Sequence, residues 1–451
     1  GAAMFDEVPP GYSHTLFDVK FLDDSNVQAS GDSVAGLSAG DTAALEAISR
    51  TYSVVAVTPV FTTPKLELDR TRERGERMSG EALPDLSTWM RYEIASGDDA
   101  EAFMKAMRSL DSIYSVEPAA LPSPPPAVTP DFSGSQGYLT PANVGIDALF
   151  SWGITGGDGT GITIFDVEYD WNQTHEDLSK INGLPLLVNP GDSNNSPFDN
   201  NHGTAVVGEV AGDDNGIGVT GISKGASVGL APTVTTNLGF NPANAINLAA
   251  AAAVPGDVIL IEQQADVCGL PSGSYGPQEW IGTVYSAIQT ATATGISVVE
   301  AAGNGNVNLD SAACGTTFNR SVRDSGAIIV GAGGTGGTNL QRLGFSSYGS
   351  RLDLQGWGQN VMTTGYGGHY KNPDDLTNPN YFYTATFNGT SSASPIVTGA
   401  VANVQGIAKN QGGVLSPTAV RTLLVQTGTA QLPNESQKIG PRPNLCLLYT
   451  S

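Results

Sequence analysis

The stretch Asn388-Gly-Thr-Ser-Ser-Ala-Ser-Pro-Ile-Val-Thr-Gly-Ala400 decides how the rest of the chain is interpreted. Small residues open it and an apolar segment follows, which predicts a turn leading into a buried helix. A hydroxyl at the first turn of such a helix stands clear of bulky neighbours, at the positive end of the helix dipole. Ser391 therefore has the setting of a serine nucleophile, although an ordinary N-capped helix has the same composition.

Two further stretches favour the catalytic interpretation. Gly161-Ile-Thr-Ile-Phe-Asp166 is an apolar strand that ends on a carboxylate, and Asn201-His-Gly-Thr204 opens an apolar run. Asp, His, Ser is one of the chain orders known for catalytic triads. We expect His202 to take the proton of Ser391, and Asp166 to hold the imidazole in the right tautomer.

These stretches and several others resemble the subtilase family of serine proteases, in the family's order. The other segments are His175-Glu-Asp-Leu178, Val298-Val-Glu-Ala-Ala-Gly-Asn304, Phe345-Ser-Ser-Tyr-Gly349 and Leu415-Ser-Pro-Thr-Ala-Val-Arg421. The resemblance implies a serine endopeptidase that cleaves polypeptides. It also implies that Asn304 and the backbone N–H of Ser391 donate hydrogen bonds to the oxyanion.

The pattern of apolar segments predicts the matching architecture for residues 135–451. From residue 161 onward, continuous apolar strands alternate with helical stretches, which indicates a parallel sheet covered by helices on both faces. Sites in such α/β sheets lie at the carboxyl ends of the strands, where Asp166 and Asn304 fall. This architecture agrees with the subtilisin-like catalytic domain that the resemblance implies.

The first 118 residues predict a separate small α+β domain. Strand and helix patterns follow one another in the order βα-ββ-αβ, which is the order of a ferredoxin-like fold. Such a domain is similar to the propeptide that precedes subtilase catalytic domains and acts as intramolecular chaperone and inhibitor. An unrelated α+β domain is the alternative. Within it, the polar, Arg-rich residues 63–87 are predicted to form a mobile surface loop. The Pro-rich residues 119–134 are predicted to be a linker and the processing region.

Composition limits the partners. The chain has 451 residues and a formal net charge of −23, which argues against nucleic acid and anionic membranes as partners. No apolar run reaches the roughly 20 residues of a membrane span, and no start resembling a signal peptide is visible. The resemblance implies a secreted or exported enzyme, and cytoplasmic storage before export stays open. A separate inhibitor protein is a further partner to consider.

The three cysteines are an odd number and do not form a disulfide framework. Cys268 and Cys314 follow the two strands that we expect beside the active site. They can pair in an oxidising compartment, or remain ordinary reduced thiols.

The chain departs from the family around the substrate. Val167-Glu168 replaces the small residues that usually follow the catalytic aspartate, and Glu262 and Glu300 stand where small residues are usual. We expect Glu262 and Glu300 to meet at the S1 pocket, where two carboxylates need a retained proton or a cation. The alternative is that one of them turns away. The predicted substrate-binding residues are Glu262, Gln263, Gln264, Glu300, Ala301 and Gly303. These departures keep two alternatives open: a pseudoprotease that only binds peptides, and a transpeptidase that joins them.

The stretch Asp213-Asp-Asn-Gly-Ile-Gly-Val219 resembles the calcium loop of the family. The resemblance implies a structural calcium ion, with Asp177 as a further carboxylate ligand. The predicted ligands are Asp177, Asp213, Asn215, Ile217 and Val219. A turn of the same composition without an ion is the alternative.

Overall fold

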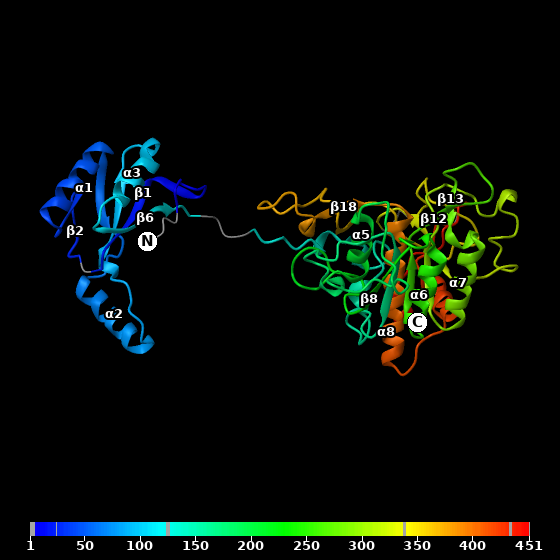
Figure 1. Cartoon of the computed structure of the whole chain (residues 1–451). Coiled ribbons are helices and arrows are strands. Elements are labelled where there is room, and N and C mark those ends of the chain that lie inside the picture. Colours follow the sequence, from blue (N-terminus) through cyan, green and yellow to red (C-terminus); the bar gives the residue numbers. More distant parts are fainter. Residues whose placement is uncertain (1–4, 24, 123–126, 337–339, 433–434, 451) are drawn as a thin grey trace. The chain divides into compact units, whose positions relative to one another are not determined.

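The computed structural model describes residues 5–450, except residues 24, 123–126, 337–339 and 433–434. The chain divides into two units, Gly1–Pro125 and Pro126–Ser451 (Figure 1). The division falls inside the predicted linker 119–134. Of that linker, Ala119 and Ala120 end a strand of the first unit, and residues 127–134 belong to the second. The prolines at 124–126 lie outside the described residues.

The first unit is a four-stranded antiparallel sheet in the order β4-β5-β1-β6. Its elements follow one another as βα-ββ-αβ, in the order that the sequence predicts, apart from a small hairpin of β2 and β3 after β1 and an additional helix between β4 and β5. Phe17, Leu45 and Phe103 join β1, α1 and α3 in a common core. The bounds are β1 (Tyr12–Phe21), β2 (Gln28–Ser30), β3 (Ser33–Ala35), α1 (Ala39–Thr51), β4 (Val54–Pro59), β5 (Trp89–Ile94), α3 (Ala100–Arg108) and β6 (Ile113–Ala120).

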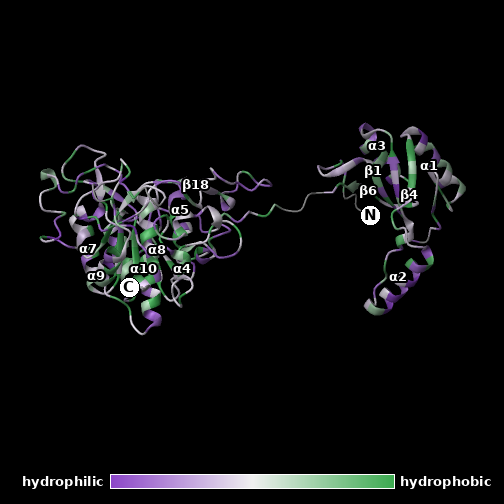
Figure 2. Ribbon diagram, turned by 180° about the vertical axis from the view of Figure 1, so that it is seen from behind, coloured by the Kyte–Doolittle hydropathy of each residue, from purple (hydrophilic) through white to green (hydrophobic). Residues whose placement is uncertain are grey.

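The predicted loop 63–87 is wrong in its secondary structure, because most of it forms the helix α2 (Lys65–Ser79). None of the residues of α2 is buried, and its ribbon is drawn mostly in the hydrophilic colour (Figure 2). Ion pairs at i,i+4 spacing, such as Lys65–Asp69, link successive turns. A search for an apolar stripe misses such a helix, since helix-forming residues and charge pairs are its only signal.

The second unit is built on a six-stranded parallel sheet in the order β16-β15-β14-β11-β7-β8. The strands are buried on both faces, which explains their continuous apolar sequences. The bounds are β7 (Thr163–Glu168), β8 (Ser227–Pro232), β11 (Val258–Ile261), β14 (Ser297–Ala301), β15 (Ile328–Gly333) and β16 (Leu354–Trp357). This confirms the predicted α/β fold.

Helices cover both faces of this sheet (Figure 1). One core packs Ile164 and Leu260 of the sheet against α5 (Asn201–Ala211), α8 (Thr390–Asn410) and α9 (Pro417–Thr427). The opposite core packs Phe165 and Ile259 against α6 (Pro242–Ala252) and α7 (Gly282–Ala293). Because side chains alternate along a strand, each residue of the sheet is assigned to one of the two faces. The remaining elements are α4 (Ala148–Ser151), α10 (Leu445–Thr450) and the hairpins of β9 (Val234–Thr235) with β10 (Gly239–Phe240), β12 (Gln264–Asp266) with β13 (Tyr275–Pro277) and β17 (Val361–Thr364) with β18 (Tyr383–Phe387).

Among the described residues, none of the helices combines the length and the apolar character that a bilayer crossing requires.

Candidate active site

Ser391 is the second residue of α8. The residue before the helix, Gly389, has a φ of 97°, a conformation that favours glycine, and a Cβ there would lie 3.2 Å from Nδ2 of Asn304. Ser391 therefore follows a turn that only a glycine forms without strain. It lines a cleft of about 440 Å³ together with His202 and Asn304, so the structure brings these three predicted residues to one site.

His202 is the second residue of α5, and its ring meets the ring of Phe387 edge-on. Nδ1 of His202 lies 2.5 Å from Oε2 of Glu168, the last residue of β7. Burial disfavours the charged imidazolium, but the charge and the hydrogen bond of Glu168 outweigh it, and the pKa of His202 is raised. The carboxylate that orients this imidazole is therefore Glu168.

The prediction that Asp166 holds the imidazole does not agree with the geometry. Oδ2 of Asp166 accepts a hydrogen bond of 2.7 Å from the indole N–H of Trp171, and Oδ1 is buried without a partner in the described part of the chain. Asp166 and Glu168 point to the same face of the sheet because they are two residues apart on β7. Asp166 lies deeper along the strand, whereas Glu168 ends the strand. Burial, and next the charge of Glu168, raise the pKa of Asp166 well above the usual range.

Asn304 is exposed at the cleft beyond the end of β14. Its Oδ1 accepts hydrogen bonds from the backbone N–H and the hydroxyl of Thr390, at 2.8 and 3.0 Å. Since the oxygen of the amide is held in this way, Nδ2 is the atom that remains to donate to a substrate. This is the arrangement that a predicted oxyanion donor requires.

Glu262 follows β11 and lies buried beneath α8. Its Oε1 lies 3.0 Å from the hydroxyl of Ser394, and its Oε2 has no partner among the described residues. Burial and the charges of Asp166 and Glu168 raise the pKa of Glu262 well above the usual carboxyl range. The hydroxyls of Ser394 and Ser391, which lie near this carboxyl group, oppose this rise only in part.

The predicted meeting of Glu262 and Glu300 is wrong. Glu300 is paired in register with Ile261, so it faces the side of the sheet opposite to Glu262. There it accepts a hydrogen bond of 3.2 Å from the backbone N–H of Glu279, and the charge of the buried Arg351 acts on it. The alternative, in which one glutamate turns away and is bonded to the backbone, describes Glu300.

Most of the other predicted substrate-binding residues contact residues of the site, but they do not line the cleft. Gln264 accepts the backbone N–H of Asn304 at 2.8 Å, and the N–H of Gly303 donates to the hydroxyl of Thr390. Ala301 is fully buried within β14, and Gln263 is buried with Nε2 at 3.5 Å from Glu168. None of the six residues lines the cleft that contains Ser391.

Sequence reasoning missed another group of residues that line this cleft. They come from the segment around β17 and β18, which runs directly into Ser391, and they are Tyr366, Gly368, Thr384, Thr386, Phe387 and Asn388. The signal was the aromatic and threonine-rich composition immediately before the glycine turn. Thr384, Thr386 and Phe387 belong to β18, whereas Tyr366 and Gly368 lie in the segment that connects β17 to β18.

The predicted calcium ligands form a hydrogen-bonded turn. One oxygen of Asp177 accepts from Nδ2 of Asn215 at 3.1 Å, and the other accepts from the N–H of Val219 at 2.7 Å. A Cβ on Gly218 would meet Oδ2 of Asp177 and the hydroxyl of Tyr383, so both groups lie close to this glycine. Both oxygens of Asp177 are thus bonded to N–H donors, so these contacts give no support for the implied calcium ion.

The outer part of the predicted loop is also engaged. Asp213 accepts the N–H of Ser179 and lies beside the ammonium of Lys180, while the N–H of Ile217 donates to the oxygen of Asn215. In the described part of the chain, no group of three or more His, Cys, Asp or Glu side chains is arranged to hold a metal ion.

Cys268 and Cys314 form a disulfide bond. The sequence left open whether these two cysteines are paired or are reduced thiols, and in the structure they are paired. The bond joins the connection between β12 and β13 to the segment after β14, which also contains Asn304. It lies in a separate apolar cluster with Val307 and Phe318.

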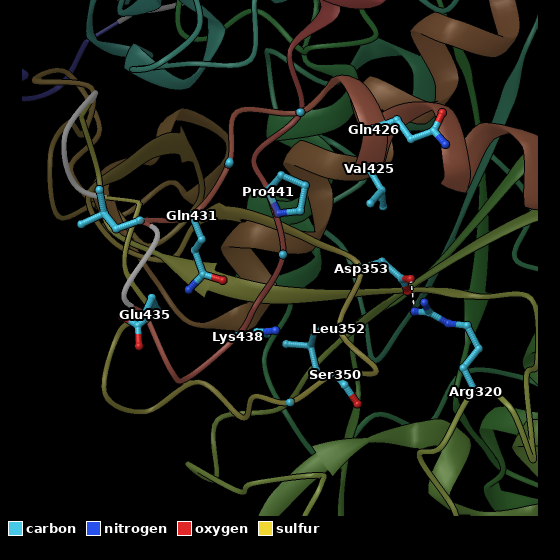
Figure 3. A pocket seen from close by; sticks show the side chains of 15 residues that line it. Arg320, Ser350, Leu352, Asp353, Val425, Gln426, Gln431, Glu435, Lys438 and Pro441 are labelled. Atoms are coloured by element: carbon cyan, nitrogen blue, oxygen red, sulfur yellow. Dashed lines mark hydrogen bonds and ion pairs between the residues drawn. The ribbon is translucent and has the colours of Figure 1, made fainter.

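A second hollow, of about 590 Å³, lies on another part of the unit (Figure 3). Arg320 and Asp353 form an ion pair at one side of it, and Glu435 and Lys438 lie at another. None of the residues predicted for catalysis lines this hollow, so its size does not make it the candidate site.

Comparison with known proteins agrees with the fold. The model of the subtilase family matches residues 157–440. Subtilisin BL of Lederbergia lenta is 30% identical over 283 residues, which are 63% of this chain and 88% of the relative. Subtilisin E of Bacillus subtilis is 29% identical over 255 residues, which are 56% of this chain and 57% of the relative.

A solved protease structure from Pseudoalteromonas arctica shares the fold, with a TM-score of 0.51 and 23% identity, and the match covers 72% of this chain and 99% of that chain. The family model covers more than half of the chain, and the segments it covers include the cleft with Ser391, His202 and Asn304. The chain is thus a member of the subtilase family of serine proteases.

Proposed function

We propose that the chain is a serine endopeptidase in which Ser391 is the nucleophile, His202 the general base and Glu168 the carboxylate that positions the imidazole. The contact that supports this most directly is the 2.5 Å separation of Glu168 and Nδ1 of His202, beside the cleft that Ser391 and Asn304 line. Glu168 replaces Asp166 in the role that the sequence pattern predicts for an aspartate.

Each of these groups has a defined role in the proposed reaction. Glu168 accepts the Nδ1 hydrogen of His202, so Nε2 is free to take the proton of Ser391 as the hydroxyl attacks a peptide carbonyl. The imidazolium that forms is stabilised by the charge of Glu168 and returns the proton to the leaving amine. Nδ2 of Asn304 and the backbone N–H of Ser391 donate to the oxyanion, and such a side-chain donor contributes about 3 to 4 kcal/mol.

Labelling with a fluorophosphonate tests this proposal. The parent is expected to label and to cleave casein, and Ser391→Ala is expected to lose both, by roughly a million-fold in kcat. Ser392→Ala is the matched control, because its hydroxyl is engaged with the carbonyls of Trp357 and Gly389. If Ser391→Ala labels like the parent, the nucleophile is another residue.

The same experiment separates the two alternative functions. A pseudoprotease would neither label nor cleave, and a transpeptidase would label but give joined peptides, which product masses reveal. The contact between Glu168 and His202 favours a working base over a pseudoprotease. Nothing observed at the cleft favours joining over hydrolysis.

We further propose that the first unit inhibits the second, as the propeptides of the family do. The support is its βα-ββ-αβ element order and its own core, which allows it to fold separately. When residues 5–122 are added to residues 127–450, proteolysis is expected to fall with a saturating dose. Cleavage that is unaffected at any dose would contradict this role.

Cutting of the chain between the units would release the first unit as a separate inhibitor. A separate inhibitor protein would compete with the first unit for the cleft.

We propose secretion or export on the basis of the bond between Cys268 and Cys314. Disulfides persist mainly in oxidising compartments. The calcium ion that the sequence predicts receives no support from the geometry of Asp177 and Asn215, and no step of the proposed reaction depends on it.

A further inference from the structure

Glu262 lies beside Glu168, beneath the first turns of α8. Its backbone N–H lies 3.4 Å from the carbonyl of Val167, so the pairing of β11 with β7 continues beyond the last paired residues and brings Glu262 next to Glu168. Both side chains, and that of Asp166, point to the face covered by α5 and α8. The hydroxyls of α8 that approach Glu262 are those of Ser394, 3.0 Å from Oε1, and Ser391.

The hydrogen bonds around Ser394 indicate where a proton lies. The hydroxyl of Ser394 is 2.9 Å from the carbonyl of Thr390 and 3.0 Å from Oε1 of Glu262. A hydroxyl has one hydrogen, and a carbonyl oxygen can only accept. Ser394 can therefore donate to only one of the two oxygens. Both contacts are hydrogen bonds if Ser394 donates to the carbonyl of Thr390 and a proton on Oε1 of Glu262 is donated to the oxygen of Ser394.

Oε2 of Glu262 is then left as an acceptor. It is buried and has no partner among the described residues, apart from the approach of the Ser391 hydroxyl to this carboxyl group. A buried acceptor without a hydrogen bond is costly, so Ser391 is the donor that this oxygen requires.

The charges that face Glu262 also favour a neutral acid. β7 contributes Asp166 and Glu168, α5 contributes Glu209 and His202, and the facing part of α8 contributes only hydroxyls. Glu262 takes part in none of the ion pairs found in the described ranges, while the single nearby imidazole is bonded to Glu168. Several buried carboxylates so close together cannot all be ionised.

We propose that Glu262 is a protonated carboxylic acid that positions the hydroxyl of Ser391, and that ionisation of Glu262 switches the protease off at alkaline pH. This inference rests on the proposed function of Ser391 and His202. In it, Glu262 is a positioning residue that acts through Ser391 and has no contact with the substrate.

The neutral and the ionised form would act differently on the reaction. The neutral acid accepts only an ordinary hydrogen bond from Ser391, which His202 can replace when substrate arrives. The carboxylate would hold the same hydrogen by a charge-assisted bond, which is about twice as strong. It would also place a negative charge close to the oxyanion that forms on the substrate, where the site is built to stabilise negative charge.

The pH dependence of kcat/KM tests the inference. In the parent, kcat/KM is expected to fall about tenfold per pH unit above the pKa of Glu262. Glu262→Gln preserves the shape of the neutral acid and is expected to keep the activity of the plateau while losing the alkaline fall. Glu262→Ser, with the small residue usual in the family, is expected to lose the alkaline fall but also part of the plateau activity.

Glu300→Gln is the matched control, because Glu300 is an equally buried glutamate on the opposite face of the sheet. It is expected to keep the alkaline fall of the parent. Two outcomes would overturn the inference. If the alkaline fall is unchanged in Glu262→Gln, Glu262 is a structural residue. If folded Glu262→Gln has lost activity at every pH, Glu262 works as a carboxylate.

Infrared spectroscopy gives a second measurement that does not depend on activity. The Ser391→Ala protein is expected to show the carbonyl stretch of a protonated carboxyl group. The double variant that also carries Glu262→Gln is expected to lack this band, so the difference spectrum of the two proteins should contain it. The absence of any difference band would overturn the assignment of the proton. If the parent neither labels nor cleaves, the proposed function fails, whereas the infrared result still decides the state of Glu262.

Discussion

Oε2 of Glu168 lies 2.5 Å from Nδ1 of His202, and Glu168 is two residues beyond the aspartate that the sequence pattern assigns to this role. The longer side chain at the end of β7 reaches the imidazole, while Asp166 is bonded to the indole of Trp171. The carboxylate of the proposed triad thus lies one full repeat of the pleat further along the strand than the sequence predicts, on the same face.

Glu168→Gln and Asp166→Asn are therefore expected to differ. In Glu168→Gln the amide cannot stabilise the imidazolium, and kcat/KM is expected to fall by about a thousand-fold to ten-thousand-fold, as for triad carboxylates elsewhere. Asp166→Asn keeps an acceptor for Trp171 and is expected to stay within about tenfold of the parent, since it has no contact with the base. Steady-state kinetics on a peptide substrate distinguish them. The reverse ranking would restore Asp166 to the triad.

The amide of Asn304 is expected to act on the transition state rather than on substrate binding. Asn304→Ala should lower kcat by about a hundred-fold to a thousand-fold and leave KM nearly unchanged. Thr390→Val removes one of the two hydrogen bonds that orient the amide and keeps the backbone N–H, so its loss should be smaller. Separate measurement of kcat and KM checks both. A rise in KM with unchanged kcat in Asn304→Ala would contradict an oxyanion role.

Parts of this site could be predicted because local sequence determines them. Ser391 and His202 each lie in the first turn of a helix, and Asn304 follows a buried strand, so the parallel sheet brings all three to one edge. The carboxylate could not be predicted in the same way. Asp166 and Glu168 share a face, and which of them reaches His202 depends on side-chain length and on the position of α5 against the sheet.

Register and distant contacts explain the other differences. Glu262 and Glu300 lie near the ends of neighbouring strands, but the pairing of Ile261 with Glu300 sends them to opposite faces, and sequence alone does not fix that register. The loop around Asp177 matches a calcium pattern, yet the hydroxyl beside Gly218 comes from Tyr383 on β18, far along the chain.

The stability of the second unit is expected to be insensitive to calcium. A ligand raises the melting temperature only when it binds the folded state, and Asp177 is already bonded to Asn215 and Val219. Thermal unfolding in millimolar calcium and in chelator should therefore coincide. Tyr383→Phe should destabilise the unit by about 1 to 3 kcal/mol, because it leaves Glu176 without the phenol hydroxyl. A calcium-dependent rise in the parent that disappears in Asp177→Asn would show that an ion displaces these contacts.

Glu209 is expected to make the second unit less stable as the pH rises. It lies on α5, is fully buried, and neither of its carboxyl oxygens has a partner among the residues that the structure describes. Burial, and next the charge of Glu262, raise the pKa of Glu209 well above the usual range. Between the pKa of the unfolded chain, about 4.3, and the raised pKa of the folded state, the folded protein binds a proton that the unfolded chain does not.

Stability should therefore be greatest below the unfolded pKa and fall, by up to about 1.4 kcal/mol per pH unit from this group, until the pH passes the folded pKa. Glu209→Gln cannot ionise, so it should match the parent in acid and exceed its stability at neutral and alkaline pH. Urea unfolding across pH, in the Ser391→Ala background to prevent self-cleavage, measures this. Asp214→Asn, which removes an exposed partner of Lys224, is the control and should change little at any pH. Parallel stability curves for Glu209→Gln and the parent would mean that Glu209 is ionised in the folded protein and that its charge is compensated.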